Sequence, residues 1–292
     1  MSFEGTAAAL AVAMLGPMAP CGHAQATSTA EQTSGTTSTS AQADGTTARS
    51  QTGRLSFREP DPIEFEDHNG YVQLFDGKSL QGWDGDPSIW RVEEGAIVGE
   101  STLEKPSANS YITYRGFTGK NFDLKLEIKV EKGGGSGIQY RSKTGVPWLA
   151  LRPGQAQPNL NWMDTGLQAD FWYPVSPRTS TFTGQIYSEN TPLRIIAWRG
   201  QVVHMDPGKP PRLVANIADR EALGGYVRIN DWNQYLIIAR GGALIHILNG
   251  HLMAVLVDDD PNSPNNVSGE IGIEIEGAPS KVSVRDIWVK KY

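Results

Sequence analysis

The chain has 292 residues and a formal net charge of −6, with 39% of its residues hydrophobic and 20% charged. These values are ordinary for a soluble globular domain with some additional sequence. The mildly acidic balance argues against nucleic acid or an anionic membrane as the partner. A single cysteine, Cys21, excludes a disulfide framework. No apolar run approaches the ~20 residues of a membrane-spanning helix, and 32 glycines, 18 prolines and 8 tryptophans indicate a turn-rich β protein.

Residues 1–26 resemble a secretory signal peptide. A short apolar segment, AAALAVAMLG, precedes the small-x-small cleavage site Ala24-Gln25-Ala26. The residues before the apolar segment include no Lys or Arg, which departs from the usual pattern. We expect export, with a periplasmic location. A lipid anchor at Cys21 is the less favoured alternative, because Pro20 precedes the cysteine.

Residues 27–69 are predicted to form a disordered linker. Over 27–55 the chain is Thr, Ser, Ala, Gln and Gly with almost no large apolar side chain. Such a segment cannot bury enough surface to offset the entropy lost on ordering. From Gly70 onwards the residue composition changes, and residues 70–292 are expected to form a single domain.

Short strands separated by turn signals follow one another through this domain. Alternation is clearest in NFDLKLEIKV (121–130), and Glu94-Gly95 marks a hairpin turn within 90–100. The remaining strands are expected in 71–83, 135–143, 166–171, 182–189, 193–200, 232–250, 251–259, 269–277 and 283–292. Short helical turns are expected in 163–167 and 218–225. The pattern predicts an all-β sandwich of two antiparallel sheets.

The hairpin WNQYLIIARGGALIHILNG (232–250) is the most apolar part of this pattern. Two strands meet at Gly241-Gly242 and are apolar on both faces, which places them inside the sandwich. His246 is the exception, because a titratable side chain in an apolar strand needs a hydrogen-bond partner or a ligand.

Several of these segments, in this order, resemble the DUF1080 family, also called the 3-keto-disaccharide hydrolase or 3-keto-glucoside 1,2-lyase/hydratase domain. The matching pieces are LFDGKSLQGW, WRVEEGAIVGE, NFDLKLEIKV, GSGIQYRS, GLQADF, TGQIYSE, the segment from Asp231 to Asp260, GEIGIEIEG and VRDIWVKKY. The resemblance spans residues 71–292 and implies a concanavalin-like jelly roll. Where many members have Gln-x-His-x-Gly, this chain has Glu274-Ile275-Glu276-Gly277, so Glu276 replaces a histidine.

The resemblance also implies a sugar oxidised at C3 as the substrate. A C3 ketone acidifies the C2 proton, and loss of that proton can expel the C1 substituent by β-elimination. Water then adds to the enone, and the net result is hydrolysis. Such a site needs a base near C2, a donor to the C3 oxygen and an acid for the leaving group.

Three strands carry polar side chains at positions i and i+2, which places them on one sheet face. The pairs are Gln139 with Arg141, Gln168 with Asp170, and Gln185 with Tyr187 and Glu189. We expect a concave polar face on which Asp170 or His246 is the base and Arg141 or Tyr187 stabilises the oxygen. The predicted substrate-binding residues are Gln139, Gln168, Gln185, Glu189 and Asn249. A structural Asp170–Arg141 ion pair, a core His246 and a glutamine ladder are the alternatives.

No cofactor is certain, but a divalent metal ion held by Asp170 and His246 could polarise the keto group. The run 258–260, three aspartates, could bind calcium or form a solvated turn. A carbohydrate is the expected partner, and a sugar 3-dehydrogenase would supply the keto substrate.

Two rival functions remain open. A non-catalytic carbohydrate-binding module is favoured by the change to Glu276 and by the many functions one fold can host. A glycosidase acting on unoxidised sugars would need two carboxylates about 5–9.5 Å apart. Glu127, Glu189 and Asp170 are its candidates.

Overall fold

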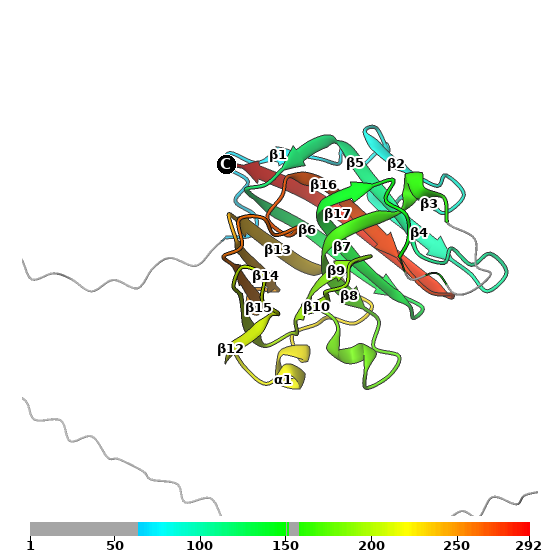
Figure 1. Ribbon diagram of the computed structural model, residues 1–292. Helices are drawn as coiled ribbons and strands as arrows, with labels where there is room; N and C mark the ends of the chain where they lie inside the picture. The colour runs from blue at the N-terminus through cyan, green and yellow to red at the C-terminus, as the bar shows by residue number, and fades with distance from the viewer. Residues whose placement is uncertain (1–63, 150, 152–157) are drawn as a thin grey trace, which may run out of the picture. The chain divides into compact units, whose positions relative to one another are not determined.

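The computed structural model describes residues 64–149, 151 and 158–292 (Figure 1). The predicted signal peptide and most of the predicted linker therefore lie outside the described residues. Residues 64–69, also assigned to the linker, contact a sheet: Lys125 Nζ donates to the carbonyls of Glu64 and Asp67 at 2.9 and 2.6 Å. The ring of His68 stacks on Trp288 at 4.2 Å. Among the described residues, no helix is long and apolar enough to cross a membrane.

Sheet A is the larger of two sheets and contains ten strands among the described residues. Its order is β12-β11-β15-β14-β13-β6-β17-β4-β3, with β1 paired to β17. The strands are β1 Val72–Gln73, β3 Trp90–Glu93, β4 Ala96–Ser101, β6 Phe122–Glu131, β11 Gln201–Met205, β12 Arg212–Asn216, β13 Asn233–Arg240, β14 Ala243–Leu248, β15 His251–Asp258 and β17 Ser280–Lys291.

Sheet B contains seven strands among the described residues, in the order β10-β9-β8-β7-β16-β5-β2. The strands are β2 Trp83–Gly85, β5 Ser110–Gly119, β7 Gly135–Thr144, β8 Asp164–Trp172, β9 Ile186–Glu189, β10 Arg194–Ala197 and β16 Gly269–Ile275. The helical turns are η1 Leu160–Trp162, η2 Thr179–Thr181 and α1 Arg220–Gly224.

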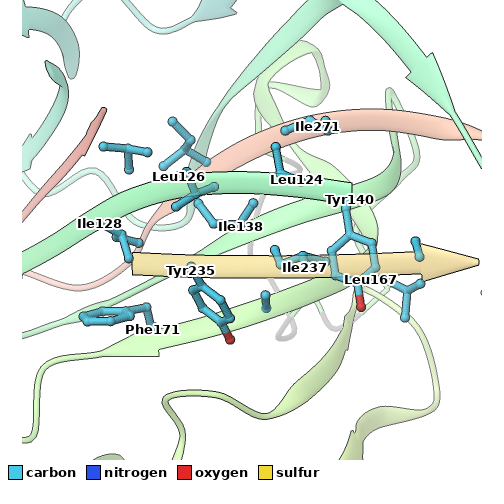
Figure 2. Packing of buried hydrophobic residues seen from close by; sticks show 14 of the residues in the cluster. Leu124, Leu126, Ile128, Ile138, Tyr140, Leu167, Phe171, Tyr235, Ile237 and Ile271 are labelled. Carbon is cyan, nitrogen blue, oxygen red and sulfur yellow. The ribbon is translucent and has the colours of Figure 1, made fainter. Parts of the chain in front are cut away.

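The core lies between the two sheets, because each sheet turns its alternate, apolar side chains toward the other (Figure 2). On β6, the predicted alternation is confirmed: Phe122, Leu124, Leu126, Ile128 and Val130 are all buried. Across from them, β7 and β8 contribute Ile138, Tyr140, Leu167 and Phe171. Burial of this apolar area is the main term that holds the sheets together.

Tight turns join the hairpins where the sequence predicts them. Glu94 and Gly95 both have positive φ (50° and 77°), the geometry of a type I′ turn between β3 and β4. The hairpin predicted in 232–250 is β13–β14, paired from Tyr235↔Leu248 to Arg240↔Ala243, with Gly241-Gly242 at its turn. β13 lies between β14 and β6, inside sheet A as predicted.

The chain thus folds as the predicted all-β, concanavalin-like jelly-roll sandwich, with three differences. The sheets are antiparallel except where β11 pairs parallel with β15. β5, β11 and β12 were not predicted, and every residue of β12 is exposed, so burial imposes no alternation there. The helical turn expected in 163–167 is wrong because Asp164 begins β8, whereas α1 lies within the one expected in 218–225.

Candidate active site

A cavity of about 610 Å³ lies over the face of sheet B that points away from the core. On β8, Leu167, Ala169 and Phe171 face the core, whereas Gln168 and Asp170 line the cavity. The side-chain period of two in a strand therefore gives one sheet an apolar face and a polar face. A cavity of this size suits a small ligand such as a mono- or disaccharide.

A glycine on the polar face lets one side chain cross the neighbouring strand. Gly137 lies beside Asp170 in the β7–β8 pairing. A Cβ at Gly137 would lie 2.3 Å from Nε2 of Gln168, so the absence of a side chain lets Gln168 cross β7. Gln168 Nε2 then donates to Oε2 of Glu274 on β16. Strand interiors rarely contain glycine except where something approaches the backbone closely, as the Gln168 side chain does here.

Four acidic side chains line the cavity, and we call Asp170, Glu189, Glu274 and Glu276 the carboxyl cluster. Asp170 and Glu274 are only 3% and 1% exposed, and Glu189 is 7% exposed. Buried carboxyl groups normally pair with cations, so several acids gathered around one cavity are a feature of functional sites.

Neutral donors, rather than cations, hold the two deepest carboxyls. Oε1 of Glu274 accepts from Tyr111 Oη at 2.7 Å and from Asn109 Nδ2 at 2.8 Å. Oδ2 of Asp170 accepts from Nε2 of Gln185. These amides and the phenol fix the orientation of the carboxyls without neutralising them.

Burial raises the pKa of every member of the carboxyl cluster, because it removes water from the charged form. The pKa of Asp170 is raised well above its usual value by burial and then by the charges of Glu274, Glu189 and Glu276, against a lowering hydrogen bond from Gln185. The pKa of Glu189 is raised for the same main reason, and burial with the Glu274 charge raises the pKa of Glu276 to about 8. Burial therefore favours the protonated form of each member, and a carboxyl that acts as a base must first lose its proton.

The rim of the cavity carries a phenol and two arginines. Burial raises the pKa of the Tyr187 phenol, which therefore stays a hydrogen-bond donor. The guanidinium of Arg194 lies 5.7 Å from the centre of the Tyr187 ring, and that of Arg178 lies 5.8 Å from the ring of Phe182. Arg194 has a φ of 53°, a strained conformation for a long side chain and common at functional sites.

The structure brings together five of the predicted site residues. Asp170, Tyr187, Gln168, Gln185 and Glu189 all line the cavity. The polar i, i+2 pairs of β8 and of residues 185–189 therefore do share one face, as predicted. The catalytic and binding roles assigned to these residues stay predictions.

The predicted meeting of Arg141 with Asp170 is wrong. Arg141 has a φ of 51°, and the β7–β8 register shifts between Tyr140 and Lys143. Such a bulge re-aims the side chain. The buried guanidinium donates to the carbonyls of Lys120, Asn265 and Gly241 at 2.8, 2.7 and 2.9 Å. Arg141 thus joins three loops and contributes no cation to the cavity.

The predicted meeting of His246 with Asp170 is also wrong. His246 lies on β14 of sheet A, inside the core, on the other side of sheet B from the cavity. Its Nε2 lies 2.9 Å from Tyr140 Oη and its Nδ1 lies 3.2 Å from the Gln185 carbonyl. Burial lowers its pKa to about 3, so the imidazole is neutral at physiological pH. The alternative of a hydrogen-bonded core histidine describes this geometry.

Two predicted substrate-binding residues also lie away from the cavity lining. Gln139 pairs with Gln168 across β7 and β8 but is fully buried, and its Oε1 accepts from Ser142 Oγ at 3.2 Å. Asn249 lies in the turn after β14 with a φ of 50°. Its side chain accepts from the Gln234 amide and donates to the Tyr226 carbonyl, at 2.9 and 2.8 Å.

The predicted metal ligands do not fit a shared ion. Asp170 lines the cavity on the outer face of sheet B, whereas His246, on sheet A, lies in the core against the inner face. Both imidazole nitrogens of His246 already have partners. In the 258–260 run, Asp258 accepts from Asn265 Nδ2 at 3.1 Å, and Asp259 pairs with His204 at 2.8 Å. Within the described ranges, no three or more His, Cys, Asp or Glu side chains are grouped to hold a metal ion.

Several residues that line the cavity were not predicted from the sequence. Glu274 shares the parity of Gly272 and Glu276 on the segment GEIGIEIEG, so the same i, i+2 signal could have found it. Missed as well are Asn109, Trp148, Trp172, Arg178, Thr179, Phe182, Arg194 and Ile195, which come from loops and strand ends without such a pattern.

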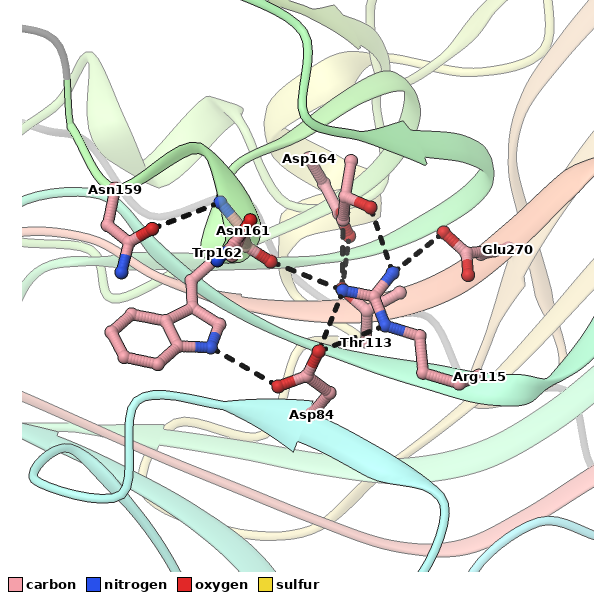
Figure 3. Close-up of polar contacts among 9 residues, drawn as sticks. Asp84, Thr113, Arg115, Asn159, Asn161, Trp162, Asp164 and Glu270 are labelled. Atoms are coloured by element: carbon pink, nitrogen blue, oxygen red, sulfur yellow. Dashed lines mark hydrogen bonds and ion pairs between the residues drawn. The ribbon is translucent and has the colours of Figure 1, made fainter.

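A second polar cluster lies on sheet B around Arg115 (Figure 3). The guanidinium pairs with Asp84 at 3.1 Å and with Glu270 at 2.9 Å. Close by, Asp164 is buried and accepts from Thr113 Oγ1 at 3.1 Å. Burial raises the pKa of Asp164 to about 7.

The chain matches one family model and a relative of known name. The family model of the 3-keto-alpha-glucoside-1,2-lyase-like domain matches residues 70–290. A protein of Bacteroides thetaiotaomicron named 3-keto-disaccharide hydrolase is 33% identical over 185 residues, which cover 54% of this chain and 63% of that protein. The alignment thus spans less than two thirds of the relative.

Solved structures of similar fold have low sequence identity. A candidate glycosyl hydrolase of Parabacteroides distasonis ATCC 8503 is 19% identical with a TM-score of 0.47, over 80% of this chain and 100% of that chain. The carbohydrate-binding module CBM66 of Bacillus subtilis is 11% identical with a TM-score of 0.43, over 72% and 96% of the two chains.

Proposed function

Because this chain belongs to the 3-keto-alpha-glucoside-1,2-lyase-like domain family, we propose that it cleaves the glycosidic bond of 3-keto-glycosides, including 3-keto-disaccharides. The observation that carries this proposal is the carboxyl cluster, with three of its four members buried, in a cavity of about 610 Å³. Elimination at C2 needs a base and an acid within one site, and the cluster offers carboxyl groups for both roles.

Asp170 is the proposed base. Its carboxyl lies on the polar face of β8, is held by Gln185 Nε2, and has a raised pKa, so its carboxylate is a stronger base than an ordinary aspartate. It accepts the C2 proton while the C1–C2 double bond forms and the C1–O bond breaks. A positioned base contributes about 10²–10⁴ in rate.

Glu276 is the proposed acid. With a pKa of about 8 it holds a proton at neutral pH and can give it to the departing oxygen. Its place in the cavity offers a role for the residue that replaces a histidine of the family pattern. Tyr187 is the proposed donor to the C3 oxygen, since its phenol lines the same cavity and stays protonated.

Hydration completes the reaction. Water adds its hydroxyl to C1 and a proton returns to C2, which restores the 3-keto sugar and frees the leaving alcohol. The net change is hydrolysis, and the carboxyl that took the C2 proton can return one there. No step in this scheme requires Arg141 or His246.

The test is release of the leaving sugar from a 3-keto-disaccharide by purified protein. We expect release from the 3-keto substrate and none from the unoxidised disaccharide. A matched acid outside the cavity, Glu127, pairs with Arg285 at 2.7 Å on sheet A, so Glu127→Gln should retain activity. Binding of the 3-keto-disaccharide without release would favour the carbohydrate-binding module. Release from the unoxidised disaccharide would favour a two-carboxylate glycosidase using Asp170 and Glu189.

A 3-keto substrate requires a preceding oxidation at C3. We therefore propose that a sugar 3-dehydrogenase supplies the substrate. Periplasmic export stays a prediction from residues 1–26.

A further inference from the structure

The segment Pro147–Leu149 is fastened to the end of β9 by one side chain. Asn190 Nδ2 donates to the Pro147 carbonyl at 3.0 Å, and its Oδ1 accepts from the Leu149 amide at 2.7 Å. The two bonds lie on either side of Trp148, which lines the cavity. A single amide therefore fixes the backbone from which this indole projects.

Asn190 is suited to this position by its backbone. Its φ is 54°, in the left-handed region that asparagine adopts more readily than other residues with a side chain. Its own N–H donates to Oε1 of Glu189 at 3.2 Å. The residue that fastens Trp148 thus also contacts a member of the carboxyl cluster.

The chain just before Pro147 is also joined to the chain just before β8. Arg115 on β5 donates to Thr144 Oγ1 at 2.9 Å and to the Asn161 carbonyl at 3.2 Å, the latter contact being drawn in Figure 3. The Gly145 amide also donates to the Leu160 carbonyl at 3.0 Å. These contacts and the two bonds of Asn190 hold Pro147–Leu149 in place, with Trp148 lining the cavity.

We propose that Trp148 is a substrate-binding residue that stacks on a pyranose ring, and that Asn190 is the positioning residue that holds it. This inference rests on the proposed function for the identity of the ligand. An indole offers a large, rigid apolar surface at low entropy cost. The face of a pyranose with all hydroxyls equatorial presents only C–H groups, so it matches that surface.

The experiment measures the dissociation constant of a 3-keto-disaccharide by calorimetry in the Asp170→Asn background, in which we expect turnover to be slow. Trp148→Ala should raise the dissociation constant by about tenfold, and Trp148→Phe, which keeps an aromatic face, by no more than about threefold. Asn190→Gly keeps the left-handed backbone but removes the amide, and should weaken binding by about three- to fivefold.

A double-mutant cycle separates positioning from general damage. If Asn190 acts through Trp148, the Trp148→Ala/Asn190→Gly variant should bind no more than about twofold worse than Trp148→Ala alone. Asn230→Gly is the matched control, because Asn230 also has a positive φ, of 59°, and does not line the cavity. It should leave the dissociation constant unchanged.

Unchanged binding in Trp148→Ala would overturn the inference, and additive losses in the cycle would overturn the role of Asn190. Wild-type release assays run in parallel separate the two proposals. If wild type releases no sugar while Trp148→Ala still weakens binding, the proposed function fails and the stacking role stands. If the 3-keto-disaccharide does not bind at all, both fail.

Discussion

From Leu167 to Phe171, β8 of sheet B has two faces that are both hidden from water but chemically opposite. On β8, Leu167 and Asp170 are 1% and 3% exposed, yet the first faces the core and the second faces the cavity. Exposure alone would not distinguish them. What distinguishes them is their neighbours: apolar side chains on one face, and amides, a phenol and other carboxyls on the other.

The same contrast separates the two titratable groups nearest Gln185. His246 Nδ1 lies 3.2 Å from the Gln185 carbonyl on the core side, and Asp170 accepts from the Gln185 side chain on the cavity side. Burial lowers the pKa of His246 to about 3 and raises that of Asp170, so burial favours the neutral form of both. Only the aspartate lines a cavity that can hold a substrate. A perturbed pKa therefore marks a candidate catalytic group only together with access.

Asp170→Asn should have the largest effect on the cavity side. The amide keeps the shape of the side chain but cannot accept the C2 proton, so kcat/KM for a 3-keto-disaccharide should fall by about 10²–10⁴. Thermal unfolding should show a stability no lower than that of wild type, because a buried carboxyl is replaced by a neutral group. Wild-type kcat/KM in the Asp170→Asn variant would remove Asp170 from the mechanism.

His246→Ala should have the largest effect on the core side, and on stability instead of chemistry. The change leaves a cavity and removes the partner of Tyr140 Oη, so the free energy of unfolding should fall by about 2–4 kcal/mol in urea titration. Activity per folded molecule should stay within about threefold of wild type. A loss as large as that of Asp170→Asn in a folded variant would return His246 to the list of catalytic candidates.

Glu276→Gln tests the raised pKa through the pH dependence of stability. The protonated form of Glu276 is favoured in the folded state, so its stabilisation is present below pH 4.5 and is lost as the pH rises through about 8. Glutamine cannot ionise, and the variant should match wild type at pH 4 and exceed it by about 2 kcal/mol at pH 9. This difference is smaller than the pKa shift of Glu276 alone would give, because proton binding is shared among the neighbouring carboxyls. Equal pH profiles for the two proteins would contradict the burial of an ionisable Glu276.

Gly137→Ala should have the smallest effect and probes the floor of the cavity. The new Cβ would lie within 2.3 to 2.7 Å of three atoms of Gln168, which must then leave Glu274. We expect kcat/KM to fall by about tenfold with circular dichroism unchanged. As a comparison, Gly145→Ala has nothing within 4 Å of the added Cβ, although its φ of 80° adds backbone strain. Equal kcat/KM in the two variants would argue against the contact with Gln168.

Much of this fold follows from local pattern. The alternation of β6 and the glycine turns of two hairpins predict strands whose faces are fixed by burial. The polar pairs on β8 and at 185–189 identify five of the residues that line the cavity for the same reason. Arg141 was misplaced because a bulge on β7 breaks the two-residue period, which residue types alone do not show.

His246 was misplaced for a different reason. Its parity within β14 was clear, but the sequence does not say which sheet holds β14 or what lies across the core from it. Trp148 and Arg194 come from loops and strand ends, where no period exists. Long-range packing alone brings them to the cavity.

The proposed elimination is tested most directly by measuring how fast deuterium is incorporated at C2 during turnover in heavy water, which mass spectrometry follows. Because the proposed reaction removes the C2 proton of the 3-keto ring and returns one from solvent, the 3-keto sugar produced by wild type should carry deuterium at C2 faster than free 3-keto sugar exchanges without protein. His246→Ala should do the same per folded molecule, and Asp170→Asn should release and exchange at least about 10²-fold more slowly. Formation by wild type of a 3-keto sugar that retains its C2 proton would contradict elimination. C2 exchange in Asp170→Asn at the wild-type rate would contradict the role assigned to the cavity face of sheet B.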